Sequence, residues 1–223
     1  MLKGIRNALI TKFMKTRLFE FFVLGILPYM RFSNYYAAIR GWQYKRGYSL
    51  LHPGDIILSV DRRKLLSLIV PGAFAHCALC VAKGDNEVFE VAEMTKDHYT
   101  KSTFFDVCKE ADRVVILRCT EWDADYTKQV IDNCRRFEGK RYDVTFTPDT
   151  ERLYCPQLII ASDHERRIDI PYDTLPFLGR SYVSPRCLYD ARNVEIVWDS
   201  GLAEVAVREP EQVVYGRLSP SAA

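Results

Sequence analysis

The chain has 223 residues, of which 48% are hydrophobic and 27% charged, as is usual for one globular domain with a sizeable core. The formal net charge of +2 gives no reason to expect nucleic acid or a strongly acidic partner. Seven scattered cysteines, an odd number, do not suggest the disulfide framework of a small secreted protein. We therefore expect a reducing compartment, the cytoplasm, with membrane association as an open possibility.

The amino-terminal segment is basic and contains a predicted amphipathic helix. Apolar residues recur at helical spacing from about Leu9 to Phe22, and five basic residues among the first 20 face one acid, Glu20. Most such stripes in soluble proteins face the core, so we expect residues 1–50 to be a helical extension that packs on the domain. Peripheral contact of residues 1–28 with a membrane surface is the alternative.

The apolar run from Leu18 to Leu27 is the one obvious membrane candidate, but it has about half the length of a spanning helix. It contains Glu20 and is followed by Pro28, so we do not expect it to cross a bilayer. The acid and the lack of a small-x-small cleavage site also make a signal peptide the weaker interpretation.

The middle of the chain predicts β-strands. Short segments rich in Val, Ile and Leu lie between turn residues at 55–60, 77–82, 87–92 and 113–118. The turn sequence at 83–86 should join the second and third strands as an antiparallel hairpin. These segments predict a small antiparallel sheet or barrel.

Two helices follow the strands. Residues Asp123 to Phe137 place apolar side chains on one helical face, with Asp123 as a suitable N-cap and Gly139 as a stop. A shorter apolar run begins at Cys155, and Pro156 suits the first turn of a helix because its missing N–H has no partner there. We therefore expect Cys155 at the amino end of a helix.

This position suits a nucleophilic cysteine. A helix amino terminus favours the thiolate, and a neighbouring imidazole can take the proton and later return it to a leaving group. Of the four histidines, His76 begins a predicted strand and is best placed to face a helix start, whereas His164 lies toward the far end of the helix of Cys155. A lone cysteine or histidine is more often a buried core residue, so the two assignments depend on each other.

Several short motifs in this order resemble the permuted branch of the NlpC/P60 papain-like superfamily, the YiiX/YebB-like group. Each motif is weak alone, but their order and intervals are specific, and the resemblance covers residues 53 to about 163. The motifs are PGDIIL at 53–58, PG at 71–72, HCAL at 76–79, VFEVA at 88–92, GKRYD at 139–143 and YC at 154–155.

The resemblance implies an α+β, circularly permuted papain-like fold, in which a small antiparallel sheet packs against helices. It implies a Cys-His-polar triad that acts on amide bonds, with the cysteine at Cys155, the histidine at His76 and the third member at Glu90. Because side chains alternate along a strand, an error of one residue in register would exchange Glu90 with Glu93 or Glu87. The catalytic domain would span residues 51–200, with a tail at 201–223.

The segment after Cys155 departs from the family. Pro156 and Gln157 stand where the family usually has Ser-Glu, and Pro156 cannot donate a backbone N–H to an oxyanion hole. Tyr142 is our candidate for a second donor, because the resemblance places it in the cleft. We assign Tyr154, beside the cysteine, to the same oxyanion or substrate-binding region.

Other kinds of site have less support. The C-x-x-C of Cys77 and Cys80 would lie on opposite faces of a strand, and a zinc site lacks further ligands. The glycines form no nucleotide-binding motif. We expect neither a metal nor a cofactor, and the oligomeric state is left open.

Three functions follow from these observations. The first is a cysteine amidase or peptidase that cleaves cell-wall peptides or similar small amides through an acyl-enzyme. The second is a lipid acyltransferase or thioesterase that uses the same Cys-His pair, brought to a membrane by the basic amino end. The third is a catalytically silent binding module, if Pro156 has broken the oxyanion hole.

Overall fold

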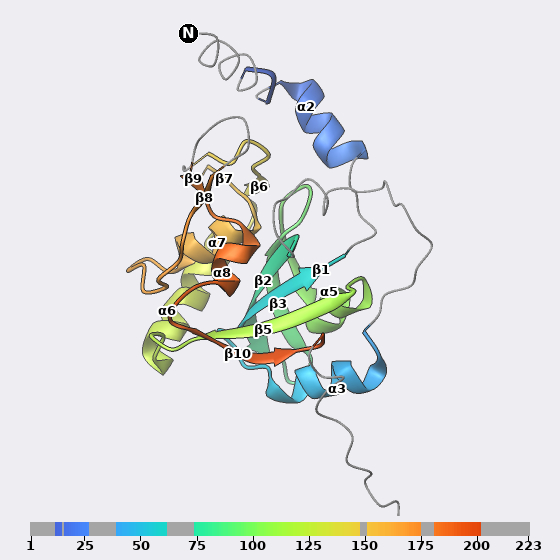
Figure 1. The fold of residues 1–223 in the computed structure, drawn as a ribbon, viewed down its shortest axis with the longest axis vertical. Helices are drawn as coiled ribbons and strands as arrows, with labels where there is room; N and C mark the ends of the chain where they lie inside the picture. The colour runs from blue at the N-terminus through green and yellow to red at the C-terminus, as the bar shows by residue number, and fades with distance from the viewer. Residues whose placement is uncertain are drawn as a thin grey trace, which may run out of the picture.

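A six-stranded sheet forms the centre of the structure, a computed structural model that describes residues 12–14, 16–26, 39–61, 74–147, 151–174 and 181–201. The strand order is β10-β5-β1-β2-β3-β4, and all neighbouring strands are antiparallel (Figure 1). The strands are β1 (Ile56–Val60), β2 (His76–Lys83), β3 (Phe89–Met94), β4 (Tyr99–Thr103), β5 (Arg113–Cys119) and β10 (Val194–Asp199).

Helices cover both faces of this sheet. Against one face lie α6 (Ala124–Arg135), α7 (Cys155–Ser162) and α8 (Pro185–Tyr189), and against the other lie α3 (Gly41–Leu50) and α5 (Phe104–Lys109). Because the strand side chains alternate, Leu79 of β2 packs in the first cluster and Ala78 in the second. This arrangement of helices on a mostly antiparallel sheet confirms the α+β class.

The predicted strands and helices occur close to their expected positions. The second and third predicted strands pair as an antiparallel hairpin, β2 with β3. Helix α6 starts after Asp123, whose carboxylate accepts the Tyr126 N–H at 2.8 Å as an N-cap should. Gly139 has φ +85, the left-handed conformation that glycine adopts readily, but the helix already ends at Arg135.

Strands β4 and β10, at the two edges of the sheet, were not predicted from the sequence. β4 has only one buried side chain, Tyr99, and β10 exposes Ile196, so neither shows a regular alternation of apolar and polar residues. The remaining strands are two-residue pairs near α7: β6 (Arg141–Tyr142) with β7 (Arg152–Leu153), and β8 (Asp173–Thr174) with β9 (Ser181–Tyr182).

The described helices α3, α2 (Arg17–Phe21) and η1 (Phe22–Ile26) of residues 1–50 differ in how they meet the domain. Helix α3 buries Gln43 and Gly47, and a Cβ atom on Gly47 would lie 2.8 Å from the Trp198 ring, so the backbone packs closely on β10. Helix α2 and the π-helix η1 contain no buried residue. These two segments meet the domain through half-buried side chains and the ion pair of Glu20 with Arg152, not through a fully buried face.

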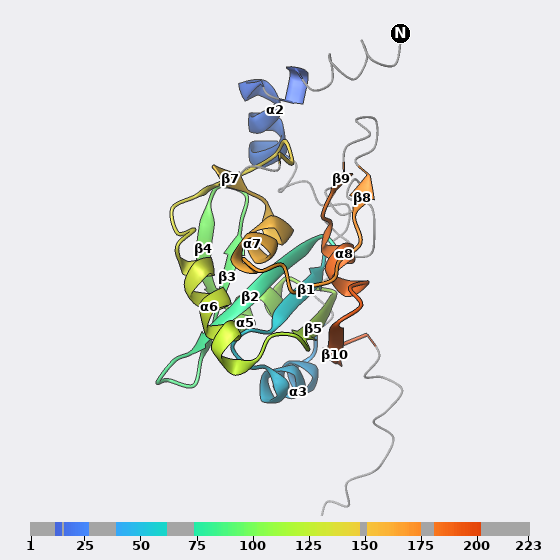
Figure 2. The same ribbon diagram turned by 90° about the vertical axis from the view of Figure 1, so that its left-hand side faces the viewer.

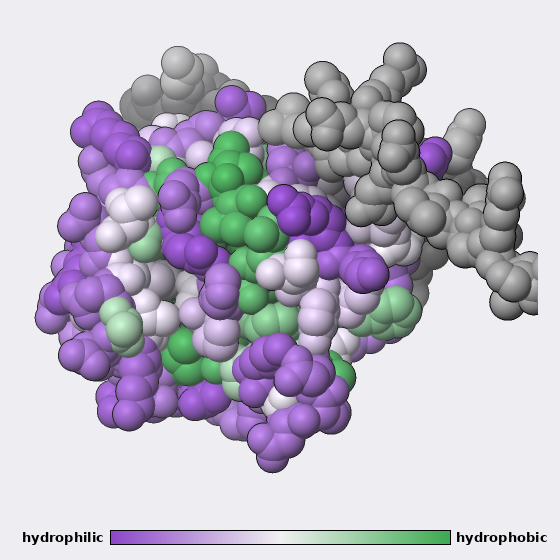
Figure 3. Space-filling model, turned by 90° about the horizontal axis from the view of Figure 1, so that it is seen from below, coloured by the Kyte–Doolittle hydropathy of each residue, from purple (hydrophilic) through white to green (hydrophobic). Residues whose placement is uncertain are grey.

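The end of the molecule at which α3 and β10 lie has its own apolar surface. Figure 3 views this end and shows a strip of hydrophobic residues between polar ones. Trp42 of α3 and Ile196 of β10 are among the exposed large apolar residues, at 43% and 46%.

The PG motif at 71–72 and the tail from 202 lie outside the described residues, as do residues 1–11.

Candidate active site

The amino end of α7 meets the first residue of β2. Cys155 is the first residue of α7, directly after the short strand β7, and Tyr154 is its N-cap residue. His76 opens β2, and its side chain is hydrogen-bonded to that of Cys155. The structure therefore brings together the cysteine and histidine that the sequence singled out, although they lie 79 residues apart.

The surroundings of Cys155 favour its thiolate. A hydrogen bond from the Cys77 thiol is the largest influence on the pKa of Cys155 and lowers it, whereas burial raises it. The hydrogen bond and positive charge of His76, together with the Cys77 backbone N–H, bring this pKa well below its ordinary value. The helix amino terminus acts in the same direction.

His76 is held between Cys155 and a carboxylate. Its Nε2 lies 2.5 Å from Glu93 Oε2, which leaves Nδ1 for the bond with Cys155. Burial lowers the pKa of His76, but its hydrogen bonds with Cys155 and Glu93 and their negative charges raise it to about 10. A thiolate beside an imidazolium is thus the favoured charge state of the pair at neutral pH.

Glu93 is fixed in turn by Ser102 of β4, whose hydroxyl donates to Oε1 at 2.5 Å. Burial raises the pKa of Glu93, but the hydrogen bonds from His76 and Ser102 and the charge of His76 outweigh it, so this pKa is lowered. The carboxylate stays ionised and orients the imidazole. A continuous chain of hydrogen bonds runs from Ser102 through Glu93 and His76 to Cys155.

The expected carboxylate, Glu90, does not contact His76. Glu90 pairs with Ala82, six residues along β2 from His76, which places it roughly 20 Å from the histidine at the extended rise of a strand. It is also exposed. Glu93 pairs with Ala78, only two residues from His76, so the register of the hairpin selects Glu93.

The two tyrosines that we expected near the oxyanion take different positions. Tyr142 of β6 is hydrogen-bonded to Cys155, and burial followed by the charges of Cys155 and Cys77 raises the pKa of its hydroxyl. The hydroxyl therefore stays protonated and can donate. Tyr154 instead accepts the Val183 N–H at 3.2 Å, so its hydroxyl is used in packing away from the thiol.

Two residues of the site were not found from the sequence. Cys77 was considered only as a zinc ligand, yet its thiol bonds with Cys155, and burial first of all raises the pKa of Cys77 so that it remains a donor. Ser102 lies in β4, which the sequence did not predict. Cys77 and Cys80 pack in opposite core clusters, as expected from strand alternation.

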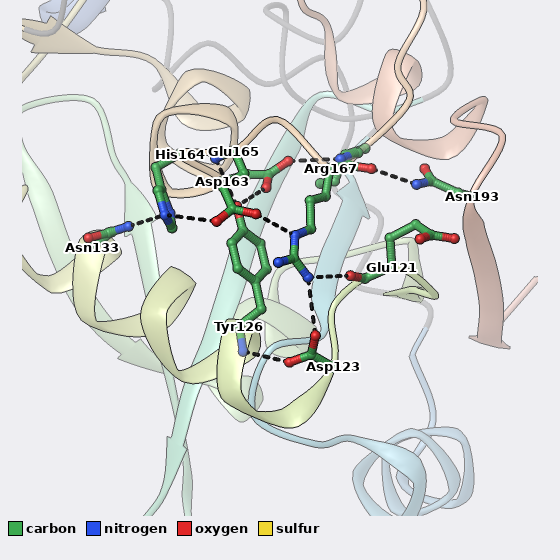
Figure 4. A network of polar contacts seen from close by, with 10 residues as sticks. Glu121, Asp123, Tyr126, Asn133, Asp163, His164, Glu165, Arg167 and Asn193 are labelled. Carbon is green, nitrogen blue, oxygen red and sulfur yellow. Dashed lines mark hydrogen bonds and ion pairs between the residues drawn. The ribbon is translucent and has the colours of Figure 1, made fainter.

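Two of the other three histidines, His164 and His52, are engaged elsewhere. His164 accepts a hydrogen bond from Asn133 on α6 at 3.1 Å and stacks on Tyr126, with ring centroids 5.2 Å apart (Figure 4). His52 is bonded to Arg118 through Nδ1 at 2.6 Å. Neither is hydrogen-bonded to Cys155, which supports the choice of His76 as the base.

The network at the far end of α7 is a structural one. Asp163 is 1% exposed and accepts the Tyr126 hydroxyl at 2.7 Å and the Ile168 N–H at 2.8 Å (Figure 4). The guanidinium of Arg167 lies over the Tyr126 ring at 3.7 Å and pairs with Glu165 at 2.8 Å. These bonds attach the loop after α7 to α6.

No described group of three or more His, Cys, Asp or Glu side chains has the arrangement of a metal site. In the same part of the chain, no helix is long and apolar enough to cross a membrane. All seven cysteines are free thiols.

Comparison with known proteins found a matching family and a solved structure with a similar fold. A family profile described as permuted papain-like amidase enzyme, YaeF/YiiX, C92 family, matches residues 50–201. The fold is similar to the crystal structure of metalloprotein YiiX from Escherichia coli O157:H7, with a TM-score of 0.56 and 18% identity over 66% of this chain and 96% of that one. No curated protein matches the chain.

Proposed function

Because this chain belongs to the permuted papain-like amidase family, whose members are cysteine peptidases or amidases, we propose that Cys155, His76 and Glu93 form its catalytic triad. The observation that carries the proposal is the bonded pair of Cys155 and His76 at a helix start, in which the pKa of the thiol is lowered and that of the imidazole is raised. Glu93 replaces Glu90 as the third member.

In the proposed reaction, the Cys155 thiolate attacks the amide carbonyl carbon and forms a C–S bond. The imidazolium of His76 gives its proton to the leaving nitrogen as the C–N bond breaks, which leaves an acyl-enzyme. His76, now neutral, takes a proton from water, which attacks the thioester and releases the acid and the free thiol. Glu93 stabilises the imidazolium in both steps.

Stabilisation of the oxyanion falls to donors other than residue 156. Pro156 has no N–H, so the backbone of this helix start lacks one donor. The Tyr142 hydroxyl, hydrogen-bonded to Cys155, lies within reach of a carbonyl carbon bonded to the sulfur. We assign Tyr142 this role.

The substrate class that we propose is a small amide such as a cell-wall peptide. A lipid ester or thioester is a second candidate, which the exposed apolar helix α2 favours (below). YiiX is described as a metalloprotein, but the described residues of this chain contain no group suited to a metal ion, and the reaction above uses none.

The test is the pH dependence of iodoacetamide alkylation at each cysteine, measured by peptide mass spectrometry on the native protein and on His76→Ala. Cys155 should react well below pH 8 and lose this advantage in the variant. Cys108 and Cys187 are internal controls, because burial raises the pKa of both thiols. If Cys155 reacts no faster than these two, the chain is a binding module rather than a hydrolase.

A substrate panel then separates the candidates. Peptide amides, including stem peptides of cell walls, should be hydrolysed by the native protein and not by Cys155→Ala. Hydrolysis of acyl thioesters or lipid esters alone would replace the amide assignment with the lipid one.

A further inference from the structure

Helix α2 and the π-helix η1 that continues it present an apolar stripe to solvent. Leu18, Phe21, Phe22 and Ile26 are 68%, 63%, 44% and 38% exposed, and their spacing of three, four and eight residues places them on one side of the helix. Between them, Phe19, Glu20, Val23 and Leu24 are half-buried, and Gly25 is exposed. A helix that packs on a core has the opposite orientation.

An ion pair fixes this orientation. Glu20 on the inner side of α2 meets Arg152 of β7 at 2.8 Å, and its side chain is 26% exposed. Figure 2 shows α2 beside β7, beyond the main sheet. Arg152 lies three residues before Cys155, so the apolar helix is attached to the same end of the molecule as the active site.

The charges around the stripe indicate an anionic binding partner. The first 17 residues contain five basic side chains and no acidic one. The first acid after them is Glu20, whose charge is paired with Arg152. Exposed aromatic and aliphatic side chains beside exposed basic ones, here Lys12 and Arg17, are the composition of a helix that lies in the interface of an anionic bilayer.

We propose that α2 and η1 form a docking surface for anionic lipid bilayers, which holds the active-site end of the protein at the membrane. Leu18, Phe21, Phe22 and Ile26 enter the interfacial region, while the exposed Lys12 and Arg17 contact lipid phosphates. The Glu20–Arg152 pair couples the helix to the segment that carries Cys155. The surface makes membrane-attached molecules the substrates within easiest reach, and this last consequence rests on the proposed hydrolase function.

The experiment is co-sedimentation with vesicles of phosphatidylcholine and phosphatidylglycerol, compared with vesicles of phosphatidylcholine alone. The native protein should bind the anionic vesicles, and the double variant L18D/F21D should bind at least tenfold more weakly. Binding should also fall at least tenfold in 0.5 M salt, because the basic residues act through screened charges.

Two controls separate docking from general surface hydrophobicity. Ile196→Asp changes an exposed apolar residue on β10, at the opposite end of the molecule (Figure 1), and should retain full binding. Glu90→Gln removes one negative charge from an exposed position on β3 and should bind within about twofold of the native protein. L18D/F21D alters exposed side chains only, so its thermal unfolding should match that of the native protein.

Absence of native binding to anionic vesicles, or full binding by L18D/F21D, overturns the docking proposal. Alkylation of Cys155 in the same samples reports on the catalytic pair independently. A protein that binds vesicles but shows no reactive Cys155 retains the docking surface and loses the proposed hydrolase function. The reverse result rejects only the docking surface.

Discussion

The two ends of helix α7 carry different kinds of polar cluster. At the carboxyl end, Asp163 accepts hydrogen bonds from Tyr126 and Ile168, which fix its position in the core. At the amino end, Cys155 is surrounded by His76, Cys77 and Tyr142, all of which can exchange or donate protons.

The pKa shifts show what the difference means. At the amino end, the pKa of Cys155 is lowered and that of His76 is raised, so the two groups form a charged pair whose proton can be transferred. At the carboxyl end, burial and the bond to Asp163 raise the pKa of Tyr126 to about 12, so its proton stays in place. One end is suited to reaction and the other to stability.

The largest effect is expected from Cys155→Ala, which removes the nucleophile. Amide hydrolysis should fall by about 10³-fold or more, since no other thiol lies beside His76 with a lowered pKa. The midpoint of thermal unfolding should change little, because the side chain is small. Cys187→Ala is the control, with its thiol bonded to Asp173 and Ser184. Comparable loss in both variants would contradict a special role of the amino end.

Glu93→Gln should have the next largest effect, because it weakens the orientation and charge of His76. We expect kcat/KM to fall by about tenfold to a hundredfold. Activity rises with pH as Cys155 ionises and falls near pH 10 as His76 loses its proton. Without the carboxylate the pKa of His76 decreases, so the alkaline limb of the pH profile should move to lower pH.

Glu90→Gln provides the matched control for this measurement, since it makes the same chemical change on the same strand. Glu90 is exposed and lies near the turn end of the hairpin, away from His76. Its pH–rate profile should coincide with that of the native protein. A shifted alkaline limb in Glu90→Gln, with none in Glu93→Gln, would restore the original assignment.

The sequence contained enough information to find Glu93. Strand alternation already made Glu93 an alternative to Glu90, and the observed hairpin brings Ala78, two residues from His76, opposite Glu93. The turn was expected at 83–86, whereas Lys83 still pairs with Phe89 in the structure. The assignment of Glu90 followed the family resemblance instead of this register. Cys155 and His76 were found because a helix start and a strand start are both visible in the pattern of residues. These local signals predicted the sheet centre and α6 as well.

The rest of the site depends on contacts that leave no periodic signal. Ser102 lies in an edge strand with one buried residue, and the bond of Cys77 to Cys155 arises only when β2 and α7 pack together. The orientation of α2 could not be predicted because its apolar stripe is compatible with packing on the core. In the structure, the exposed fractions of its side chains and the pair between Glu20 and Arg152 show which side faces the domain.

At the carboxyl end of α7, Tyr126→Phe should reduce stability without changing the chemistry. The substitution leaves Asp163 Oδ1 without its donor and the Glu165 N–H, now 2.9 Å from the hydroxyl, without its acceptor. The expected loss in the free energy of unfolding is about 1–3 kcal/mol, measured by urea denaturation. The value of kcat/KM for the folded enzyme should stay within twofold of the native one. A large fall in kcat/KM would show that the two ends are coupled.

The smallest effect is expected from Ser102→Ala, which tests how far the reactive cluster extends into the sheet. The change removes the second donor to Glu93, whose first donor, His76, remains. Loss of this hydrogen bond raises the pKa of Glu93 toward its ordinary value, but the carboxylate stays ionised at neutral pH. We expect kcat/KM to fall by about threefold to tenfold because the carboxylate is less well oriented, with KM unchanged. The alkaline limb should move slightly to higher pH, because the more basic carboxylate holds the imidazolium of His76 more tightly. Ser102→Thr keeps the hydroxyl and should restore the native pH profile, whereas a residue that only fills space would show no shift in either variant.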